Sequence, residues 1–478
     1  MTMRRSWLAM WAVVLAIALS ASLLAGATEG ASAKSKKAKY SPPAGATFNR
    51  PNYFGNSASH FAIVRTVENA IRHVRKPTKA NPYPTITIAA FLFDRVQSAN
   101  ALIAACKRGV GVRLILDRAV ENRTQRRLFK ALNADNVKKR KNGKWSKPKS
   151  GPCGTKLKKK KKKKKSGANR VNARGVPAII PPTSIKNVPK GESPKWGGDR
   201  SYAMKCSGSC RGVSTGNMHS KFYLFSKSGS AKNVVMVSSS NLNAGGAKAG
   251  WNDLYVIKNR PKLYKQFMTI HRAMTKQLRA TTQRIEFRDG PYVARFFPMR
   301  YQSKQKDPTM VDLNKIKCSS GFGKTQIYIS MFYWAGKRGA KLANKIVRLA
   351  RQGCQVRIVI GAPTDKIMRI LKGKANISVY DTRWQCSNKL DEDGHNPPEV
   401  RTHGKYVAVK GNYDGNKKAY VVMTGSANFV GGTLTVGDEV SLNIEKASAY
   451  RAYVRNWTAI RNNSKEVRTV RPCPIPID

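Results

Sequence analysis

Two stretches of the chain share one order of apolar and polar positions. The run TITIAAFLF at residues 85–93 is almost unbroken in its apolar character, and its length and composition predict a buried strand. The run QIYISMFYW at residues 326–334 repeats it. When Ile86 is aligned with Ile327, two further pairs match, Ile88 with Ile329 and Phe91 with Phe332.

Each run is followed by a helical segment, a glycine and a second apolar run. These are residues 99–107, Gly109 and 110–116 in the first copy, and 342–351, Gly353 and 354–360 in the second. This order predicts parallel strands joined by a helix. We therefore expect an α/β fold of two duplicated lobes, each a mixed sheet flanked by helices. Two common units of this kind could also match by chance, so the repeat needs support from polar residues.

Matching polar residues accompany the repeat. The first half reads MHSKFYLF at 218–225 and VVMVSSSN at 234–241, and the second reads THGKYVAV at 402–409 and YVVMTGSAN at 420–428. Side chains alternate along a strand, so the His and Lys of each His-x-Lys share a face, and the next strand returns a Ser and an Asn beside them. The matched pairs are His219 with His403, Lys221 with Lys405, Ser239 with Ser426, and Asn241 with Asn428.

These side chains suit phosphoryl transfer. That reaction needs a nucleophile, an acid for the leaving oxygen, and fixed donors for the other phosphoryl oxygens. Histidine can serve in both proton roles near neutral pH. A single His-x-Lys is usually only a surface strand, but two copies within one repeat favour an active site.

The motifs resemble those of the phospholipase D superfamily, His-x-Lys-x4-Asp followed by Gly-Ser-x-Asn. The resemblance covers about residues 45–460. It implies two lobes that share one active-site cleft, one histidine that becomes phosphorylated and a second that acts as acid and base. It also implies that no metal or other cofactor is required.

By this resemblance His219 is the nucleophile and His403 the general acid and base, although the order could be reversed. The lysines would bind non-bridging oxygens with help from the asparagines, and the two serines would bind substrate or hydrogen-bond within the site. A separate downstream acid would orient each histidine. The expected residues are Lys221, Lys405, Asn241, Asn428, Ser239, Ser426, Asp253 and Glu439.

The chain departs from the family motif at three positions. Ser226 and Lys410 stand where the motif has aspartate, and Ser238 replaces the glycine before Ser239. The resemblance implies that the aspartate supports the site rather than attacking phosphorus. Its loss therefore puts the rate and the stability in doubt more than the type of reaction.

The net charge narrows the choice of partners. Lys and Arg number 90 against 25 Asp and Glu, a formal net charge of +65. Such a surface attracts nucleic acid or anionic lipid, although it could serve solubility alone. Residues 134–200, which contain the lysine run Lys158–Lys165, are expected to be a disordered insertion.

The N-terminus has the order of an export signal: Arg4 and Arg5, an apolar run, then small residues up to Ala33. An uncleaved membrane anchor is the alternative. Eight cysteines would permit disulfides in an exported chain, and Cys206 and Cys210 could close a small loop. The expected segments are a signal peptide at 1–33, a basic linker at 34–44, and lobes at 45–270 and 271–478.

These features predict a secreted phosphodiesterase that acts as a monomer. We expect it to hydrolyse phosphatidyl lipids to phosphatidate and a free headgroup at a membrane surface. A secreted non-specific nuclease is the second possibility, because phosphate contacts dominate non-specific binding of nucleic acid. A degenerate, non-catalytic polyanion-binding protein is the third. The other histidines, His60, His73, His271 and His395, are expected to be structural or surface residues.

Overall fold

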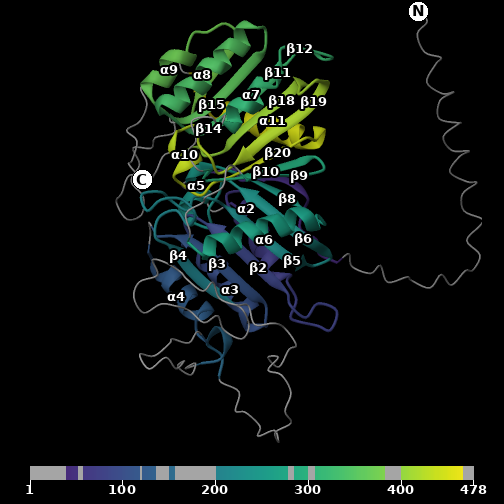
Figure 1. Ribbon diagram of the computed structural model, residues 1–478, viewed down its shortest axis with the longest axis vertical. Coiled ribbons are helices and arrows are strands. Elements are labelled where there is room, and N and C mark those ends of the chain that lie inside the picture. The colour runs from purple at the N-terminus through teal and green to yellow at the C-terminus, as the bar shows by residue number, and fades with distance from the viewer. Residues whose placement is uncertain are drawn as a thin grey trace, which may run out of the picture. The chain divides into compact units, whose positions relative to one another are not determined.

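The computed structural model describes residues 39–51, 57–118, 121–135, 150–156, 201–277, 285–299, 307–382 and 400–466. The expected signal peptide and most of the expected insertion lie outside these ranges. Figure 1 shows two sheets stacked along the long axis, each with helices against it. The chain is a mixed α/β protein, as the pattern of apolar residues predicts.

The first lobe is built on a seven-stranded mixed sheet. In spatial order its strands are β1 (Gly45–Phe48), β8 (Asp253–Ile257), β6 (Ala231–Ser238), β5 (Phe222–Ser228), β2 (Thr85–Ala90), β3 (Gly111–Asp117) and β4 (Tyr202–Cys206). The three strands β2, β3 and β4 are parallel, and the remaining neighbours are antiparallel. Its helices are α2 (Ala62–Arg72), α3 (Val96–Lys107), α4 (Arg123–Leu132), α5 (Ala244–Ala249) and α6 (Pro261–Thr275), with a 3-10 turn at Pro152–Gly154.

The second lobe repeats this sheet and extends it. Its path is β21 (Lys465–Glu466), β16 (Ile377–Asp381), β15 (Gln355–Pro363), β14 (Gln326–Trp334), β18 (Lys405–Tyr413), β19 (Asn416–Gly425), β20 (Val440–Ile444), β10 (Tyr292–Phe296) and β9 (Ile285–Asp289), with β11 (Ile316–Lys317) beside β18. Its helices are α7 (Pro308–Asn314), α8 (Gly336–Arg351), α9 (Asp365–Leu371), α10 (Gly432–Thr435) and α11 (Ala447–Asn462). Two-stranded pairs are β12 (Ser319–Ser320) with β13 (Gly323–Lys324), and β17 (Arg401–Thr402) with β7 (Gly250–Trp251).

The two sheets have the same internal order. The sequence β8-β6-β5-β2-β3 corresponds to β20-β19-β18-β14-β15, with the same parallel and antiparallel neighbours. The predicted duplication is therefore present. Strand β5 runs antiparallel to β2, and β18 runs antiparallel to β14. The residues just before β5 and β18 therefore lie at the same end of their sheets as the residues just after β2 and β14.

Aromatic side chains from both lobes form a shared core. Phe48 of β1 packs edge-on against Tyr453 of α11 with 5.0 Å between ring centroids. Phe267 of α6 packs against Phe296 of β10 at 4.8 Å. Burying large rings such as these contributes about 1.5–3 kcal/mol each. This core packs the two lobes against each other and so fixes the relative positions of the segments that carry the histidines.

The expected lobe boundary at 270/271 falls inside α6, which continues to Thr275. Helix α6 packs on β2, β5 and β6 of the first sheet, and its apolar face includes Leu263 and Phe267. The apolar spacing of this helix continues past residue 271 to Met274, so the helix crosses the expected boundary.

Three disulfides join described cysteines. They are Cys106–Cys153, Cys206–Cys210 and Cys318–Cys354. The second closes the small loop that the sequence predicted. Cys386 and Cys473 lie outside the described residues.

His271 is buried between α6 and β2 and is structural, as expected. Its Nε2–H donates to the Ile88 carbonyl oxygen at 3.1 Å, and Nδ1 accepts from Tyr202 at 3.4 Å. Burial lowers the pKa of His271 from 6.5 to about 3. The folded protein therefore keeps this histidine neutral under conditions where the unfolded chain protonates it.

We expect acid to destabilise the protein through His271. Between pH 6.5 and pH 4 the unfolded chain takes up a proton that the folded protein does not, so the free energy of unfolding should fall by about 3 kcal/mol. Denaturant titrations at several pH values would measure this, and His271→Gln should flatten the dependence. His73→Gln, at an exposed position, is the control and should keep the full dependence.

Candidate active site

The two predicted motifs meet because backbone segments of the lobes pair with each other. Thr402 of β17 pairs in parallel with Trp251 of β7, and Met218 pairs in parallel with Asp438. Consequently the His403 N–H donates to the Trp251 carbonyl oxygen, and the His219 N–H to that of Asp438, both at 2.9 Å. Each histidine is therefore held by the other lobe.

Glu439 holds His219 across the lobe boundary. The Nδ1 atom of His219 lies 2.9 Å from Glu439 Oε1, and the other carboxylate oxygen accepts a hydrogen bond from Ser426. The expected role of Glu439 as an orienting acid is present, but it acts on the histidine of the opposite lobe. Burial would raise the pKa of Glu439, yet the charges of His219 and Lys221 and the bond from His219 hold it below its ordinary value.

His403 is held by an amide rather than a carboxylate. Its Nδ1 lies 2.8 Å from the side-chain oxygen of Asn252, which also accepts from Ser239 at 3.0 Å. Asp253 was expected here, and that expectation was wrong. The Asp253 carboxylate instead accepts from Thr424 at 2.5 Å and from Tyr453 at 2.7 Å.

The repeat itself explains this correction. The Ser239 N–H donates to the Asp253 carbonyl oxygen, and the Ser426 N–H to that of Val440. Asp253 therefore corresponds to Val440, and Asn252 corresponds to Glu439. Both orienting residues stand immediately before a strand, a signal that sequence reasoning missed because it searched for acids alone.

The two lysines are buried beside the histidines. Lys221 and Lys405 each donate from Nζ to the carbonyl oxygen of their own histidine at 2.6 Å. Each Nζ also lies over an aromatic ring, 5.2 Å from the centroid of Phe91 and 5.0 Å from that of Phe332. The same rings contact His219 and His403. The matched phenylalanines of the repeat therefore form part of each half-site.

Burial lowers the pKa of all four basic groups. The pKa of Lys221 falls to about 7, and that of Lys405 falls well below its ordinary value. The pKa of His219 is lowered by burial despite the opposing charge of Glu439. That of His403 lies well below 6.5, through burial and then through the charges of Lys405 and Lys221. A bound anion would reverse these shifts, so the site favours a negatively charged ligand.

The asparagines connect each half-site to its neighbouring strand. The side-chain oxygen of Asn241 accepts from the Leu92 N–H at 3.2 Å, and that of Asn428 accepts from the Tyr333 N–H at 3.2 Å. Because the oxygen is engaged, the NH₂ group is the part of each amide that can serve a phosphoryl oxygen.

The two serines hydrogen-bond within the site. Ser239 and Ser426 are fully buried. Their hydroxyls donate to Asn252 and Glu439 and accept from the backbone N–H groups of Asp253 and Val440. These contacts agree with the expected role of local hydrogen bonding.

The departures from the family motif lie away from the chemistry. Ser226 is five residues beyond Lys221 along β5, roughly 16 Å at the usual strand rise. Its hydroxyl accepts from the Thr85 N–H at 2.9 Å. Lys410 is equally far along β18, opposite Gln326. Neither position touches a histidine, so the loss of aspartate there leaves the site intact.

No group of three or more His, Cys, Asp or Glu with the arrangement of a metal site occurs among the described residues. The groups around His219 and His403 are mainly cationic. This donor set suits an anion better than a cation.

Sequence comparison identifies the second lobe. Residues 321–460 match a family model described as "Cardiolipin synthase, PLD-like domain". The matched segment belongs to the phospholipase D superfamily. Members of this superfamily are phosphodiesterases, and the half-site of the matched segment contains His403, Lys405 and Asn428.

Three solved structures are similar to this chain at low identity. Phosphatidylserine synthase of Haemophilus influenzae Rd KW20 is 12% identical over 89% of this chain and 88% of its own, with a TM-score of 0.46. Polyphosphate kinase of Porphyromonas gingivalis is 10% identical over 87% of this chain, which spans 50% of the kinase, with a TM-score of 0.44. Nuc of Salmonella typhimurium is 17% identical over 37% of this chain and 98% of its own, with a TM-score of 0.25. No curated protein gave a significant match.

Proposed function

We propose that the protein hydrolyses phosphodiesters through a phosphohistidine formed on His219. The observation that carries this proposal is the meeting of His219 and His403 across the lobes, each held at Nδ1 by a different partner. Engagement of Nδ1 leaves Nε2 of His219 for the reaction, whereas Nε2 of His403 lies 3.1 Å from Lys405 Nζ. The carboxylate of Glu439 stabilises positive charge on His219, and that charge grows when Nε2 bonds to phosphorus.

The proposed reaction has two displacements. Nε2 of His219 attacks phosphorus, the bond to the leaving oxygen breaks, and His403 gives that oxygen a proton. A water molecule then gives its proton to His403 and attacks phosphorus, and the P–N bond to His219 breaks. The anionic substrate raises the pKa of His403 and so supplies the protonated form that the first step needs.

Four donors surround the site of reaction. The Nζ atoms of Lys221 and Lys405 and the amide groups of Asn241 and Asn428 would bind non-bridging oxygens. Burial lowers the pKa of both lysines. A bound phosphate would oppose this shift and stabilise the charged forms of the lysines. These fixed donors cost little reorganisation when charge builds up in the transition state.

Phosphatidyl lipids are the first proposed substrate class. Their cleavage would release phosphatidate and a free headgroup. The proposal is supported by the description of the matched family model, which concerns lipid phosphodiester chemistry. The high positive charge would draw the protein to anionic membrane surfaces.

Nucleic acid is a second candidate, supported by the described surface. Large apolar side chains are exposed there only at Val96, Phe322 and Tyr333, so few could anchor in a bilayer. The exposed face of α8 instead carries a row of cations, Lys337, Lys341, Arg348 and Arg351. Such rows bind phosphate backbones without sequence preference.

We further propose that the protein is exported. The order of residues 1–33 supports a signal peptide. The three disulfides support an oxidising compartment, since such bonds are rare in the cytosol. Within the described ranges, no helix has both the length and the apolar character needed to cross a bilayer.

Purified mature protein should cleave a phosphodiester substrate without added metal. The assay offers phosphatidylcholine and phosphatidylglycerol vesicles in one arm and plasmid DNA in the other, each with and without a chelator. Headgroup release supports lipid as the substrate, and DNA degradation supports nucleic acid. Loss of all activity in chelator would contradict a mechanism based on histidine alone.

A further inference from the structure

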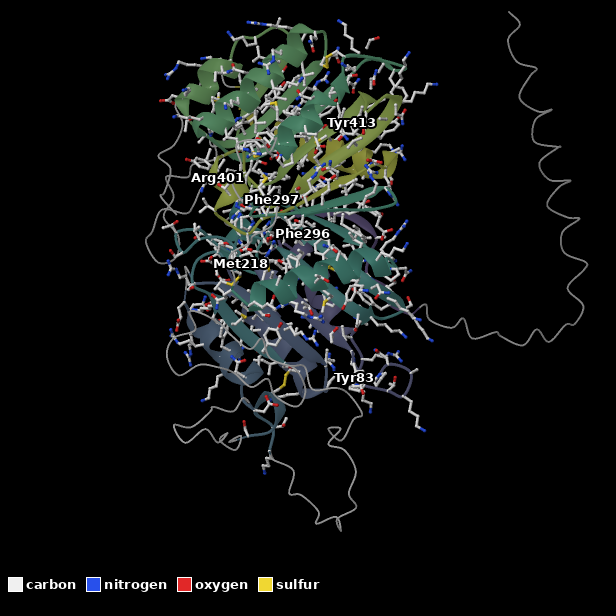
Figure 2. All side chains as sticks on the ribbon, in the orientation of Figure 1. Tyr83, Met218, Phe296, Phe297, Arg401 and Tyr413 are labelled. Carbon is white, nitrogen blue, oxygen red and sulfur yellow. A yellow bond between two sulfur atoms is a disulfide. The ribbon has the colours of Figure 1, made fainter. Side chains whose placement is uncertain are left out.

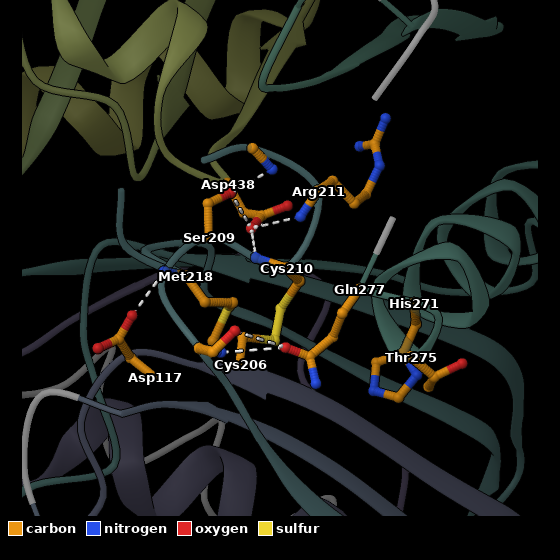
Figure 3. Close-up of a disulfide and its surroundings, with 12 residues drawn as sticks. Asp117, Cys206, Ser209, Cys210, Arg211, Met218, His271, Thr275, Gln277 and Asp438 are labelled. Carbon is orange, nitrogen blue, oxygen red and sulfur yellow. Dashed lines mark hydrogen bonds between the residues drawn. A yellow bond between two sulfur atoms is a disulfide. The ribbon is translucent and has the colours of Figure 1, made fainter. Parts of the chain in front are cut away.

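A disulfide-closed loop of the first lobe lies against the segment that carries Glu439. The loop consists of residues 206–216, and the Cys206–Cys210 bond closes its first turn. Figure 3 shows this loop and Asp438 of the second lobe beside it. Asp438 immediately precedes Glu439 and is fully buried. Neither Asp438 nor the loop has a role in the reaction described above.

One carboxylate oxygen of Asp438 receives three hydrogen bonds from the loop. The Ser209 hydroxyl donates at 2.5 Å, the Cys210 N–H at 2.5 Å and the Arg211 N–H at 3.3 Å. Hydrogen bonds to a carboxylate are stronger than those between neutral groups. The first turn of the loop therefore holds the Asp438 carboxylate in place.

Asp438 is also bonded through its backbone to the residues on both sides of Met218, one of which is His219. Its carbonyl oxygen accepts from the His219 N–H, and its own N–H donates to the Asn217 carbonyl oxygen, both at 2.9 Å. The next residue, Glu439, contacts His219 Nδ1 at 2.9 Å. A shift of Asp438 would therefore move both the backbone and the ring contact of His219.

Close packing leaves this arrangement little freedom. A Cβ atom placed on Gly212 or Gly216 would lie 2.1 or 2.2 Å from the Val436 carbonyl oxygen. Only glycine permits such an approach. The loop therefore rests directly on the backbone that leads into Asp438.

The other half-site is held in a different way. The residue that corresponds to Asp438 is Trp251, because His403 donates to its carbonyl oxygen as His219 does to that of Asp438. Trp251 has no carboxylate, and its neighbours are held by buried Asn49, which donates to the Gly250 carbonyl oxygen and accepts from the Asn252 N–H, both at 2.8 Å. Of these two half-sites, the contact between a disulfide-closed loop and a carboxylate belongs to that of His219.

We propose that the loop of residues 206–216, closed by the Cys206–Cys210 disulfide, positions the catalytic His219 through Asp438 and Glu439. Asp438 is a positioning residue in this scheme. Its effect on rate rests on the proposed function of His219, whereas its effect on the His219 ring does not.

The test compares three variants with the full-length wild type. Cys206→Ser/Cys210→Ser opens the loop, Asp438→Ala removes the acceptor, and Ser209→Ala removes one donor with little risk to folding. Cys106→Ser/Cys153→Ser removes a different disulfide of the same lobe and is the matched control. NMR titration of the histidine rings is one readout, with His219 assigned from its alanine variant and His403 as the internal reference. Cleavage of bis(p-nitrophenyl) phosphate supplies kcat and KM.

We expect the first two variants to lower the pKa of His219 and leave that of His403 nearly unchanged. Their kcat should fall about 10- to 100-fold with a much smaller change in KM, because a displacement of about 1 Å can cost that much. Ser209→Ala should lower both the pKa of His219 and kcat by smaller amounts. It tests the proposal by itself if the other two variants do not fold. The control should match the wild type.

Wild-type titration and kcat in a folded Cys206→Ser/Cys210→Ser or Ser209→Ala variant would overturn the proposal. So would an equal loss in the matched control, since it would show only a general effect of disulfides on the lobe. If the wild type cleaves no phosphodiester but the variants still lower the His219 pKa, the positioning role stands and the proposed function fails.

Discussion

Replacing His219 with alanine is expected to slow phosphodiester cleavage by about 10⁴-fold or more, the scale seen when a covalent nucleophile is removed. No other described group is placed to attack phosphorus from the position that Glu439 and Asp438 define for His219. Steady-state hydrolysis of bis(p-nitrophenyl) phosphate measures the loss. His73→Ala, at an exposed position, is the control and should keep full activity.

His403→Ala should fail at a different step. Nitrophenolate leaves without a proton, so the first displacement can proceed, but water then lacks its base. A burst of one nitrophenolate per site should precede slow turnover, and an acid-labile, base-stable phosphate should remain on His219. His219→Ala should show no burst.

Two results would contradict this assignment. A burst in His219→Ala, with phosphate on His403, would reverse the order of the two histidines. Full function of His219→Ala would support a non-catalytic polyanion-binding protein. Both outcomes can be read from the same pair of variants.

Glu439→Gln is expected to lower kcat by about 10³- to 10⁴-fold. An equivalent change at the acid that orients a catalytic histidine in serine proteases costs about 10⁴-fold. The glutamine can occupy the same space, but it cannot neutralise the positive charge that grows on His219. Burial of the site makes that lost charge expensive, since Glu439 is 3% exposed. The affinity for substrate should change much less.

Asn252→Ala is the matched comparison for Glu439→Gln. Asn252 fills the corresponding place at His403 but carries no charge, so its loss should cost about tenfold through orientation alone. Rates of both variants against pH, with bis(p-nitrophenyl) phosphate, measure the difference. If the two variants lose activity equally, the carboxylate partner does not identify His219 as the nucleophile.

The sequence by itself determined the fold class and most of the half-sites. The run at 326–334 forms strand β14, and the run at 85–93 forms β2 as far as Ala90, because apolar periodicity is a local property that burial in a sheet enforces. His219, Lys221, His403 and Lys405 could be assigned from the repeated motif, but the expected placement on a strand was wrong for the histidines, which precede β5 and β18.

The importance of the two motif positions that lack aspartate could not be judged from the sequence, for a related reason. A spacing pattern does not show which positions reach the reaction centre. Ser226 and Lys410 lie five residues beyond the lysines along β5 and β18, so their departure from the family motif falls away from the histidines. Strand length alone, at about 3.3 Å per residue, would have been enough to place them there.

Only the tertiary structure decided which partner serves which histidine. Glu439 reaches His219 from the other lobe, and Asn252 rather than Asp253 reaches His403. These contacts depend on backbone pairing between lobes and on a shared aromatic core, whose residues are far apart in the chain. Periodicity describes one element at a time and carries no information on how two lobes meet, so the asymmetry of the site could not be predicted from the sequence.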